Sequence, residues 1–246
     1  LGLVYRPEAT RTFKFNYSSA FRAANVYERY YNSGQTPNPD LLPEKIRTLE
    51  AIWEETLSPA TRLTSSAYVF RLNDQIAQVP DASTGMLAFV NQAPVTVRGG
   101  EVGIEHVWST GAHLRLSWSA QWARQDGAWP ANAPRQLLKA NLAQPLGGDW
   151  HLGAEILGVS RVATPNGTFP NYALDGREGG HTITNVTLRY APGGQAWEVR
   201  FSAYNLFDRR YGDAAPPDPY AEANFITPQA RQTYPDNGRT VRLDAL

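Results

Sequence analysis

The sequence predicts an all-β protein, specifically an antiparallel transmembrane β-barrel, and two observations carry this prediction. The first is that apolar and polar side chains alternate with a period of two over many segments of the 246-residue chain. The second is that short turns and long loops alternate strictly between those segments. Brief turns at one membrane face and long loops at the other are typical of outer-membrane barrels. A chain of this length suits one large all-β domain.

The alternation is clearest in residues 112–122. One face there carries Ala, Leu, Leu, Trp, Ala and Trp, and the other carries His, Arg, Ser, Ser and Gln. Eleven consecutive positions with this period match the length of a membrane-spanning strand. Segments 11–18, 150–156 and 196–204 repeat the pattern over shorter stretches. We therefore predict eleven strands, which cover residues 1–6, 10–21, 46–57, 61–79, 88–109, 112–125, 136–146, 149–163, 181–191, 196–210 and 232–246.

The connections between these strands set the orientation. Five are short and contain the Gly, Pro or Ser residues that close tight hairpins, at 7–9, 58–60, 109–111, 147–148 and 192–194. Five are long, at 22–45, 80–87, 126–135, 164–180 and 211–231. We expect periplasmic short turns and extracellular long loops. An odd number of strands leaves two parallel edges, so we expect these residues to be part of a larger barrel.

Composition excludes several other classes of protein. Lys plus Arg and Asp plus Glu both number 23, so the net charge is zero and a nucleic-acid partner is not expected. The chain has no cysteine, which removes disulfides and thiolate metal sites. No apolar run approaches the roughly 18 residues of a transmembrane helix, and the first residues lack the plan of a signal peptide. Neither a catalytic motif nor a metal-ligand pair of histidines is present, so we expect no enzyme, no cofactor and no metal site.

Five segments resemble, in collinear order, the C-terminal barrel of TonB-dependent receptors. They are YNLFDRRY at 204–211, FRAANVYE at 21–28, LPEKIRTLE at 42–50, FVNQ at 89–92 with GGEVG at 99–103, and GRT at 238–240. Two departures are that Ala24 replaces the usual proline and that the chain ends in Asp-Ala-Leu where the family has an aromatic residue. We interpret Asn205 and Asp208 as residues that tie down a strand end by bonding the local backbone.

The resemblance implies a receptor in the outer membrane of a Gram-negative cell. Residues 1–246 would be the C-terminal half of a 22-stranded barrel, with the N-terminal plug and the TonB-contacting region outside this chain. The implied function is uptake of a scarce ligand, a ferric siderophore or another metal chelate, opened by the TonB complex. Outer-membrane lipid would surround the barrel, and Trp118, Trp122, Trp150 and Trp197 are predicted to face it or to form its aromatic girdle.

Aromatic residues beside arginines in the long loops are the candidate ligand contacts. Stacking and charge-assisted hydrogen bonds suit a planar anionic chelate. The candidates are Arg22, Tyr27, Arg29, Tyr30 and Tyr31 in the first long loop, Trp129 in the third and Arg177 in the fourth. Ordinary loop packing is the alternative interpretation of each of these residues.

Three other functions remain open on the sequence. A passive porin-like barrel would share the strand pattern but not the five family segments. A soluble all-β carbohydrate-binding protein or glycoside hydrolase would need two carboxylates that converge on a cleft, and the sequence names no such pair. A truncated gene product without transport activity is the third.

Overall fold

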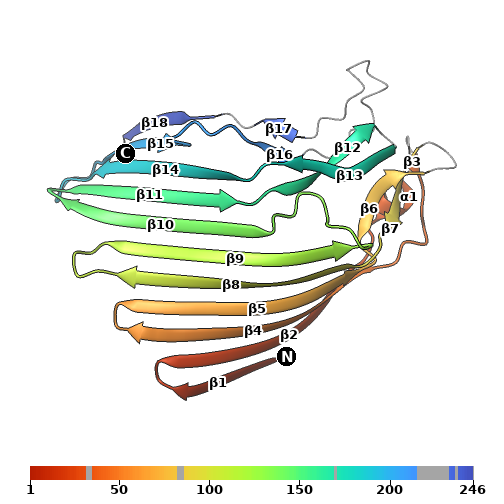
Figure 1. Ribbon diagram of the computed structural model, residues 1–246, viewed down its shortest axis with the longest axis horizontal. Coiled ribbons are helices and arrows are strands. Elements are labelled where there is room, and N and C mark those ends of the chain that lie inside the picture. The colour runs from red at the N-terminus through yellow and green to blue at the C-terminus, as the bar shows by residue number, and fades with distance from the viewer. Residues whose placement is uncertain (32–34, 82–85, 169–170, 215–232, 236–237, 246) are drawn as a thin grey trace.

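A computed structural model describes residues 1–31, 35–81, 86–168, 171–214, 233–235 and 238–245. Its main feature is one eleven-stranded antiparallel sheet in which neighbours in sequence are neighbours in space (Figure 1). The strands, in sheet order, are β1 (Gly2–Glu8), β2 (Arg11–Arg22), β4 (Glu44–Ser58), β5 (Thr61–Asn73), β8 (Val95–Val107), β9 (His113–Gln125), β10 (Gln136–Gly147), β11 (Trp150–Val159), β14 (His181–Tyr190), β15 (Val199–Tyr204) and β18 (Thr240–Ala245). The predicted number of eleven strands and their antiparallel meander are therefore confirmed.

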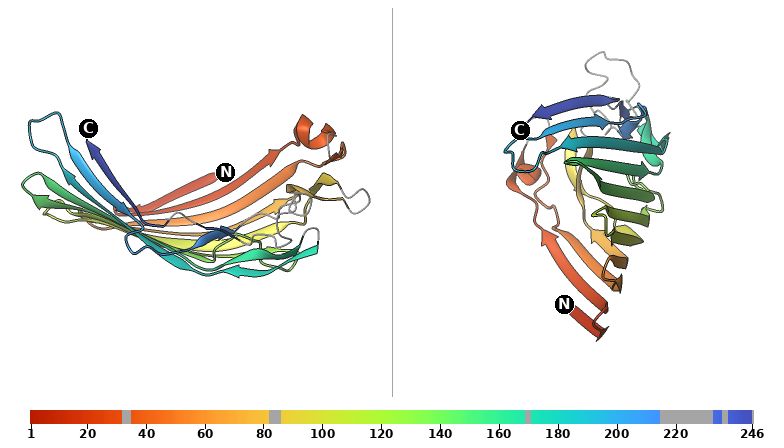
Figure 2. Two further views of the ribbon diagram at one scale, coloured as in Figure 1. Left: turned by 90° about the horizontal axis from the view of Figure 1, so that it is seen from above. Right: turned by 90° about the vertical axis from the view of Figure 1, so that its left-hand side faces the viewer.

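The sheet is strongly curved and open. Figure 2 shows it as a trough, with β1 and β18 at its two free edges. Because β1 and β18 lie at opposite ends of the strand order, the described residues do not close a barrel. Within the described residues no helix is long and apolar enough to cross a membrane.

All five predicted short turns lie at one end of the sheet, at the left of Figure 1. Three of these turns use left-handed backbone, which is found at Gly111 (φ 82°), Gly147 (φ 85°), Asp149 (φ 70°) and Gly194 (φ 78°). The long connections gather at the opposite end, which we call the long-loop end. The predicted alternation of short and long connections is thus confirmed.

The pairing register places most of the large apolar residues of the eleven strands on one face, although some, such as Phe70 and Leu137, lie on the other. In one row across the sheet, Ile104 pairs with Leu116, Leu116 with Ala140, and Ala140 with Ile156. The predicted outward tryptophans have exposed side chains, with Trp122 55% exposed and Trp118, Trp150 and Trp197 between 42% and 48%. We call this side of the sheet the apolar face. An exposed apolar face of this extent must meet another apolar phase.

The opposite side, the polar face, carries side chains that pair with one another across strands. Lys14 contacts Glu54 at 2.6 Å on β2 and β4. Glu105 of β8 accepts from both His113 and Arg115 of β9, at 2.7 and 3.1 Å. These charges are therefore neutralised locally, as expected for the inner surface of a barrel, which is polar.

Two predicted strands, 61–79 and 88–109, are each split in the structure. The first ends at Asn73, where Asp74 adopts φ 57° and turns the chain out of the main sheet into β6 (Ile76–Pro80). The second is divided into β7 (Leu87–Asn91) and β8. The segments are extended as predicted, but β6 and β7 pair with each other in a separate small sheet. The alternation of apolar and polar residues indicates extended backbone, but it does not indicate which sheet a strand joins. The predicted strands therefore continued past the points at which the chain leaves the main sheet.

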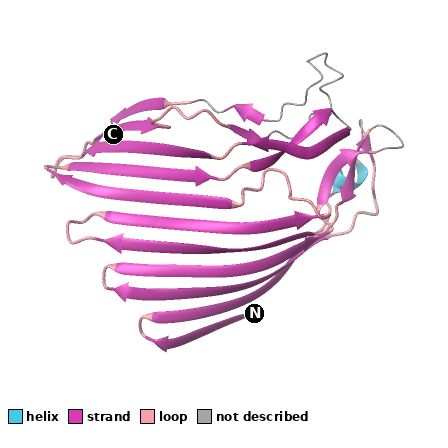
Figure 3. Ribbon diagram, viewed as in Figure 1, coloured by secondary structure: helices cyan, strands magenta, loops and turns pink. Residues whose placement is uncertain are grey.

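Further short elements lie in the predicted long loops (Figure 3). The first loop contains the helix α1 (Val26–Tyr30) and the strand β3 (Gln35–Thr36), and the fourth folds as a hairpin of β12 (Val162–Thr168) and β13 (Asn171–Glu178). The short strands β16 (Gly212–Ala214) and β17 (Thr233–Pro235) pair with each other. β16 lies at the start of the predicted loop 211–231 and β17 just after it, and most of that loop lies outside the described residues. The predicted strand 196–210 ends at Tyr204, and the predicted strand 232–246 is represented by β17 and β18.

Candidate functional site

The first two long connections, which follow β2 and β5, fold together into one compact unit at the long-loop end. In this unit, which we call the cap, β3 pairs in parallel with β7, and β7 pairs with β6. Leu41, Ile76 and Ala88 belong to the cap and are buried, each less than 10% exposed. The cap thus contains buried apolar residues of its own.

Arg22, a predicted ligand contact, joins the barrel to the cap. It is the last residue of β2, and its guanidinium donates to Glu28 of α1 at 2.9 and 3.0 Å. It also donates to Glu44, the first residue of β4, at 2.7 Å. The other oxygen of Glu44 accepts from the backbone N–H of Ile76 at 2.8 Å. The contacts of Arg22 therefore position the helix against three segments of chain.

The helix α1 begins with a capping box. The Asn25 side chain accepts from the backbone N–H of Glu28 at 2.9 Å, and the Glu28 carboxylate accepts from the backbone N–H of Asn25 at 2.8 Å. Arg29, another predicted ligand contact, donates to the backbone carbonyls of Pro39 and Leu41 at 3.1 and 3.0 Å. Both predicted arginines thus make intramolecular bonds in this structure, and a ligand contact from either stays a prediction.

Asn91 is a residue of the cap that the residue types alone did not single out. Its Oδ1 accepts from the N–H of Leu42 at 2.8 Å, and its Nδ2 donates to the carbonyls of Leu42 and Asp74 at 3.0 and 2.7 Å. One side chain therefore fastens the two connections of the cap to each other. In the sequence, Asn91 lies in the FVNQ segment, one of the five that resemble the family.

The tyrosines of the first long loop differ in their surroundings. Tyr27 stacks on Tyr31 with ring centroids 4.5 Å apart and meets Phe89 edge-on at 5.8 Å. Its hydroxyl accepts from Gln35 at 3.0 Å. Tyr30 is 56% exposed and has no ring contact among the described residues. Tyr27 and Tyr31, which are 50% and 42% exposed, therefore make ring contacts within the cap, whereas Tyr30 makes none among the described residues.

The two remaining candidates lie outside this cluster. Trp129 donates from its indole nitrogen to the carbonyl of Ala133 at 2.7 Å, and the guanidinium of Arg135 lies over its ring at 4.3 Å. Arg177 is an exposed residue of β13, paired in register with Ala163. The structure thus brings together the five candidates of the first long loop, while Trp129 and Arg177 stand on other connections.

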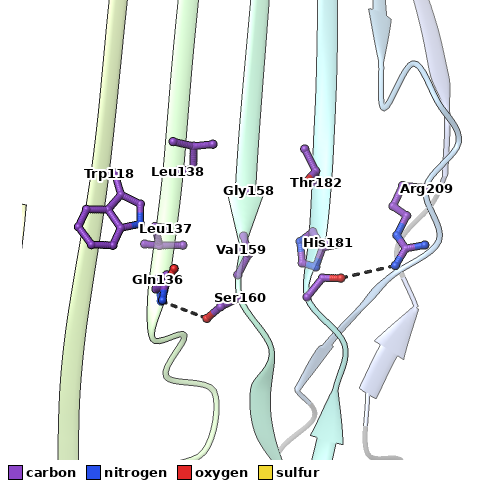
Figure 4. A pocket seen from close by; sticks show the side chains of 11 residues that line it. Trp118, Gln136, Leu137, Leu138, Gly158, Val159, Ser160, His181, Thr182 and Arg209 are labelled. Carbon is purple, nitrogen blue, oxygen red and sulfur yellow. Dashed lines mark hydrogen bonds between the residues drawn. The ribbon is translucent and has the colours of Figure 1, made fainter. Parts of the chain in front are cut away.

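A hollow lies farther along the sheet, across β9, β10, β11 and β14 (Figure 4). Its floor is open because Gly158 has no side chain between Leu138 and Thr182. Arg209 reaches it from the connection after β15 and donates to the carbonyl of Gly180 at 3.5 Å. No group of three or more potential metal ligands occurs among the residues that the structure describes.

Comparison with protein-family models matches residues 1–206 to the family described as TonB dependent receptor-like, beta-barrel. The chain belongs to the TonB-dependent receptor-like β-barrel family. A search of curated proteins returned no match. Membership agrees with the open antiparallel sheet, which has the short turns, long loops and two-faced strands of such a barrel. The family is one of receptors and is not an enzyme class.

Solved structures with the same fold include three of particular interest. The FrpB iron transporter from Neisseria meningitidis (F3-3 variant) aligns with a TM-score of 0.73 and 18% identity, over 99% of this chain and 38% of that one. The copper transporter OprC aligns with a TM-score of 0.76 and 18% identity, over 99% and 38%. FpvA of P. aeruginosa, solved with a heterologous pyoverdine and iron, aligns with a TM-score of 0.74 and 12% identity, over 99% of this chain and 31% of that one. The chain therefore spans about a third of the length of these receptors.

The NLFD segment has the structural role in this receptor barrel that the sequence predicted. Asn205 is buried, adopts φ 49°, and exchanges two 2.9 Å bonds with the backbone N–H and carbonyl of Arg209. Asp208 accepts from the N–H of Arg239 at 3.0 Å, which ties the segment to the start of β18. Phe207 is 75% exposed. The two polar residues therefore close the end of β15, as interpreted from the sequence.

Proposed function

We propose that this chain is the C-terminal half of the barrel of an outer-membrane TonB-dependent receptor that takes up a ferric siderophore or another metal chelate. Membership of the receptor family carries the proposal. The eleven strands would be half of a closed barrel of twenty-two. The plug, and the region that contacts TonB, would lie in sequence outside residues 1–246.

The different chemistry of the two faces of the sheet supports an outer-membrane location. The apolar face runs across all eleven strands and includes large exposed residues such as Leu116, Trp118 and Phe201. In a bilayer, such a face would be buried against lipid, while the paired charges of the polar face would line the lumen. Long loops then lie outside the cell and short turns in the periplasm.

The cap supplies the surface that we assign to ligand contact. Arg22, Arg29 and Asn91 are held by intramolecular bonds, so the cap is a preorganised support. Tyr30 and Tyr31 are 56% and 42% exposed on that support, where their rings are available for stacking. Stacking aromatic rings fit a planar aromatic chelate better than they fit a hydrated ion. Both the iron and the copper transporter share the fold, so the fold does not identify the metal.

The test is uptake by cells that lack the gene encoding this chain and carry the complete gene on a plasmid. Iron-55 is supplied as a ferric tris-catecholate or as a ferric tris-hydroxamate. We expect saturable uptake of one of them, abolished by a protonophore that collapses the inner-membrane proton gradient. Uptake that rises linearly with concentration and survives the protonophore would instead identify a passive porin-like barrel.

A pair of variants tests the ligand surface. Tyr30→Ala combined with Tyr31→Ala should raise the concentration for half-maximal uptake about tenfold, because two stacking contacts of about 0.5–1.5 kcal/mol are lost. Tyr17→Ala is the matched control, since Tyr17 is 43% exposed on the apolar face. Equal uptake by the double variant and the wild type would remove these tyrosines from the ligand surface, while leaving the receptor assignment intact.

A further inference from the structure

Arginines gather on the apolar face at the long-loop end. The register joins Arg47 of β4 to Arg71 of β5, Arg71 to Thr96 of β8, and Thr96 to Arg124 of β9. We call these positions the basic row. With strands about 4.8 Å apart, the four positions span about 14 Å. The side chains of its three arginines are exposed.

The basic row has cations and no matching carboxylates. Among the residues that the structure describes, Arg47, Arg71 and Arg124 form no ion pair; Arg71 donates to Asn73 at 2.9 Å, and Arg124 donates to the Gly127 carbonyl at 3.2 Å. Arg47 and Arg71 stand directly opposite each other, an arrangement of like charges that destabilises a sheet. An anion from outside the chain would relieve that repulsion.

The other end of the same face shows the contrast. Arg11 is also on the apolar side, near the short turns, and it contacts Glu55 at 2.6 Å. The indole nitrogen of Trp53 donates to the same carboxylate oxygen at 3.1 Å. The outward arginine at the short-turn end therefore has a partner within the chain, whereas those of the basic row have none among the described residues.

A hollow adjoins the basic row and gives it the form of a site. We call it the arginine hollow, and its volume is about 460 Å³. Arg98 and Arg124 come from β8 and β9, and Arg135 arrives from the loop after β9, held over the ring of Trp129. Three arginines thus line one space, and Trp122, the register partner of Arg98, lines it as well with an aromatic ring.

The position of the arginine hollow along the strands shows which part of a membrane would surround it. One row nearer the middle of the strands, Tyr17 pairs with Leu49, Leu49 with Val69, Val69 with Arg98, and Arg98 with Trp122. The residues flanking Arg98 in that row are apolar or aromatic, so the basic row stands where the apolar belt ends. Cations just outside an apolar belt are placed at the level of lipid headgroups.

We propose that the arginine hollow and the basic row bind the phosphate groups of a phosphorylated lipid in the outer leaflet of the outer membrane. Guanidinium groups bind phosphate oxygens through paired, charge-assisted hydrogen bonds. Trp122 and the apolar row below it would contact the first carbons of the acyl chains. This site faces away from the lumen, so it is separate from the ligand surface of the cap. The inference rests on the outer-membrane location proposed above.

The test uses the full-length receptor, purified in a non-ionic detergent, and native mass spectrometry with added lipid. The probes are bis-phosphorylated lipid A, phosphatidylcholine and inorganic phosphate. We expect saturable binding of lipid A, no saturable binding of phosphatidylcholine, and no competition from millimolar inorganic phosphate. Binding should weaken with added salt, because exposed charges are screened.

Two double variants decide the location of the site. Arg98→Gln with Arg124→Gln should weaken lipid A binding by at least tenfold, because hydrogen bonds to charged groups are lost. Arg62→Gln with Lys139→Gln removes the same charge from the polar face and should bind as the wild type does. The heat-dependent gel mobility of a folded barrel verifies that each variant is folded.

The outcomes separate this inference from the proposed function. Equal lipid binding by both double variants, or displacement of lipid A by inorganic phosphate, overturns the inference while the receptor assignment stands. Recovery of the full-length protein in the soluble fraction, with no detergent requirement, overturns the outer-membrane location and the inference with it. Retention of binding by Arg98→Lys with Arg124→Lys, at reduced affinity, would support paired guanidinium contacts over simple charge attraction.

Discussion

Replacing Asn91 by alanine should loosen the cap without unfolding the barrel. The substitution removes three hydrogen bonds that join Leu42 and Asp74 to β7. Each bond contributes about 0.5–1.5 kcal/mol net. Because two of the three are exposed and water can replace them, we expect a local cost of about 2 kcal/mol. That cost corresponds to about a thirtyfold increase in the population of the opened cap.

Hydrogen exchange followed by mass spectrometry measures this population in the full-length receptor. Peptides that cover residues 35–44 and 76–91 should exchange about thirtyfold faster in Asn91→Ala, while peptides from β9 and β10 should not change. Asn141→Ala is the matched control, because Asn141 is an exposed polar-face residue with no side-chain hydrogen bond among the described residues. Unchanged exchange in the cap peptides, or equal acceleration across the sheet, would refute the role of Asn91 as a local fastener.

Three further changes test the sheet, each by urea unfolding of the full-length barrel in detergent or lipid, followed by gel mobility. Asn205→Ala should destabilise the barrel by about 2–3 kcal/mol, because a buried residue at φ 49° loses two hydrogen bonds; Asn205→Gly, which keeps the backbone freedom, should cost less. Gly99→Ala should prevent correct folding, since its Cβ would lie 2.6 Å from the Ala120 carbonyl oxygen, whereas Gly103→Ala, with 3.6 Å to its nearest neighbour, should fold. In lipid, Leu116→Arg on the apolar face should destabilise by about 2 kcal/mol and Ser117→Arg on the polar face should not; equal effects of the two would contradict the assignment of the faces.

The main sheet could be predicted from the sequence because its signal is local. Each strand shows its two faces in its own residues, and each hairpin shows its turn, so eleven strands and their order followed directly. The cap could not be predicted in this way. Its parallel pairing joins Gln35 to Leu87 and Thr36 to Ala88, residues about fifty positions apart in the chain. No local pattern records such a pairing, and the alternation simply continued through Asp74 into β6.

Residue type identified the candidate arginines and aromatics, but their partners depend on the fold. Nothing in the local sequence indicates that Arg29 donates to the carbonyls of Pro39 and Leu41. Trp129 illustrates the same limit. A tight turn, with Asp126 at φ 53° and Gly127 at φ 79°, pairs Gln125 with Ala128 and so places Trp129 beside Arg124 on the apolar side. Insertion or deletion of one residue in that turn would place the Trp129 ring on the other face of the sheet.

The cap contains two kinds of residue, which cannot be told apart by residue type. Hydrogen-bonded residues support the cap, whereas exposed residues are available to contact a ligand. Arg22 and Arg29 resemble ligand contacts by type, yet their donors are used by Glu28, Glu44 and two carbonyls. Removing either arginine would therefore reduce uptake by disordering the support, as Asn91→Ala would. Tyr30 has no such bonds among the described residues, so its removal should alter ligand affinity while cap exchange stays unchanged. Measuring uptake and hydrogen exchange on the same variants thus distinguishes a residue that holds the cap from one that touches the ligand.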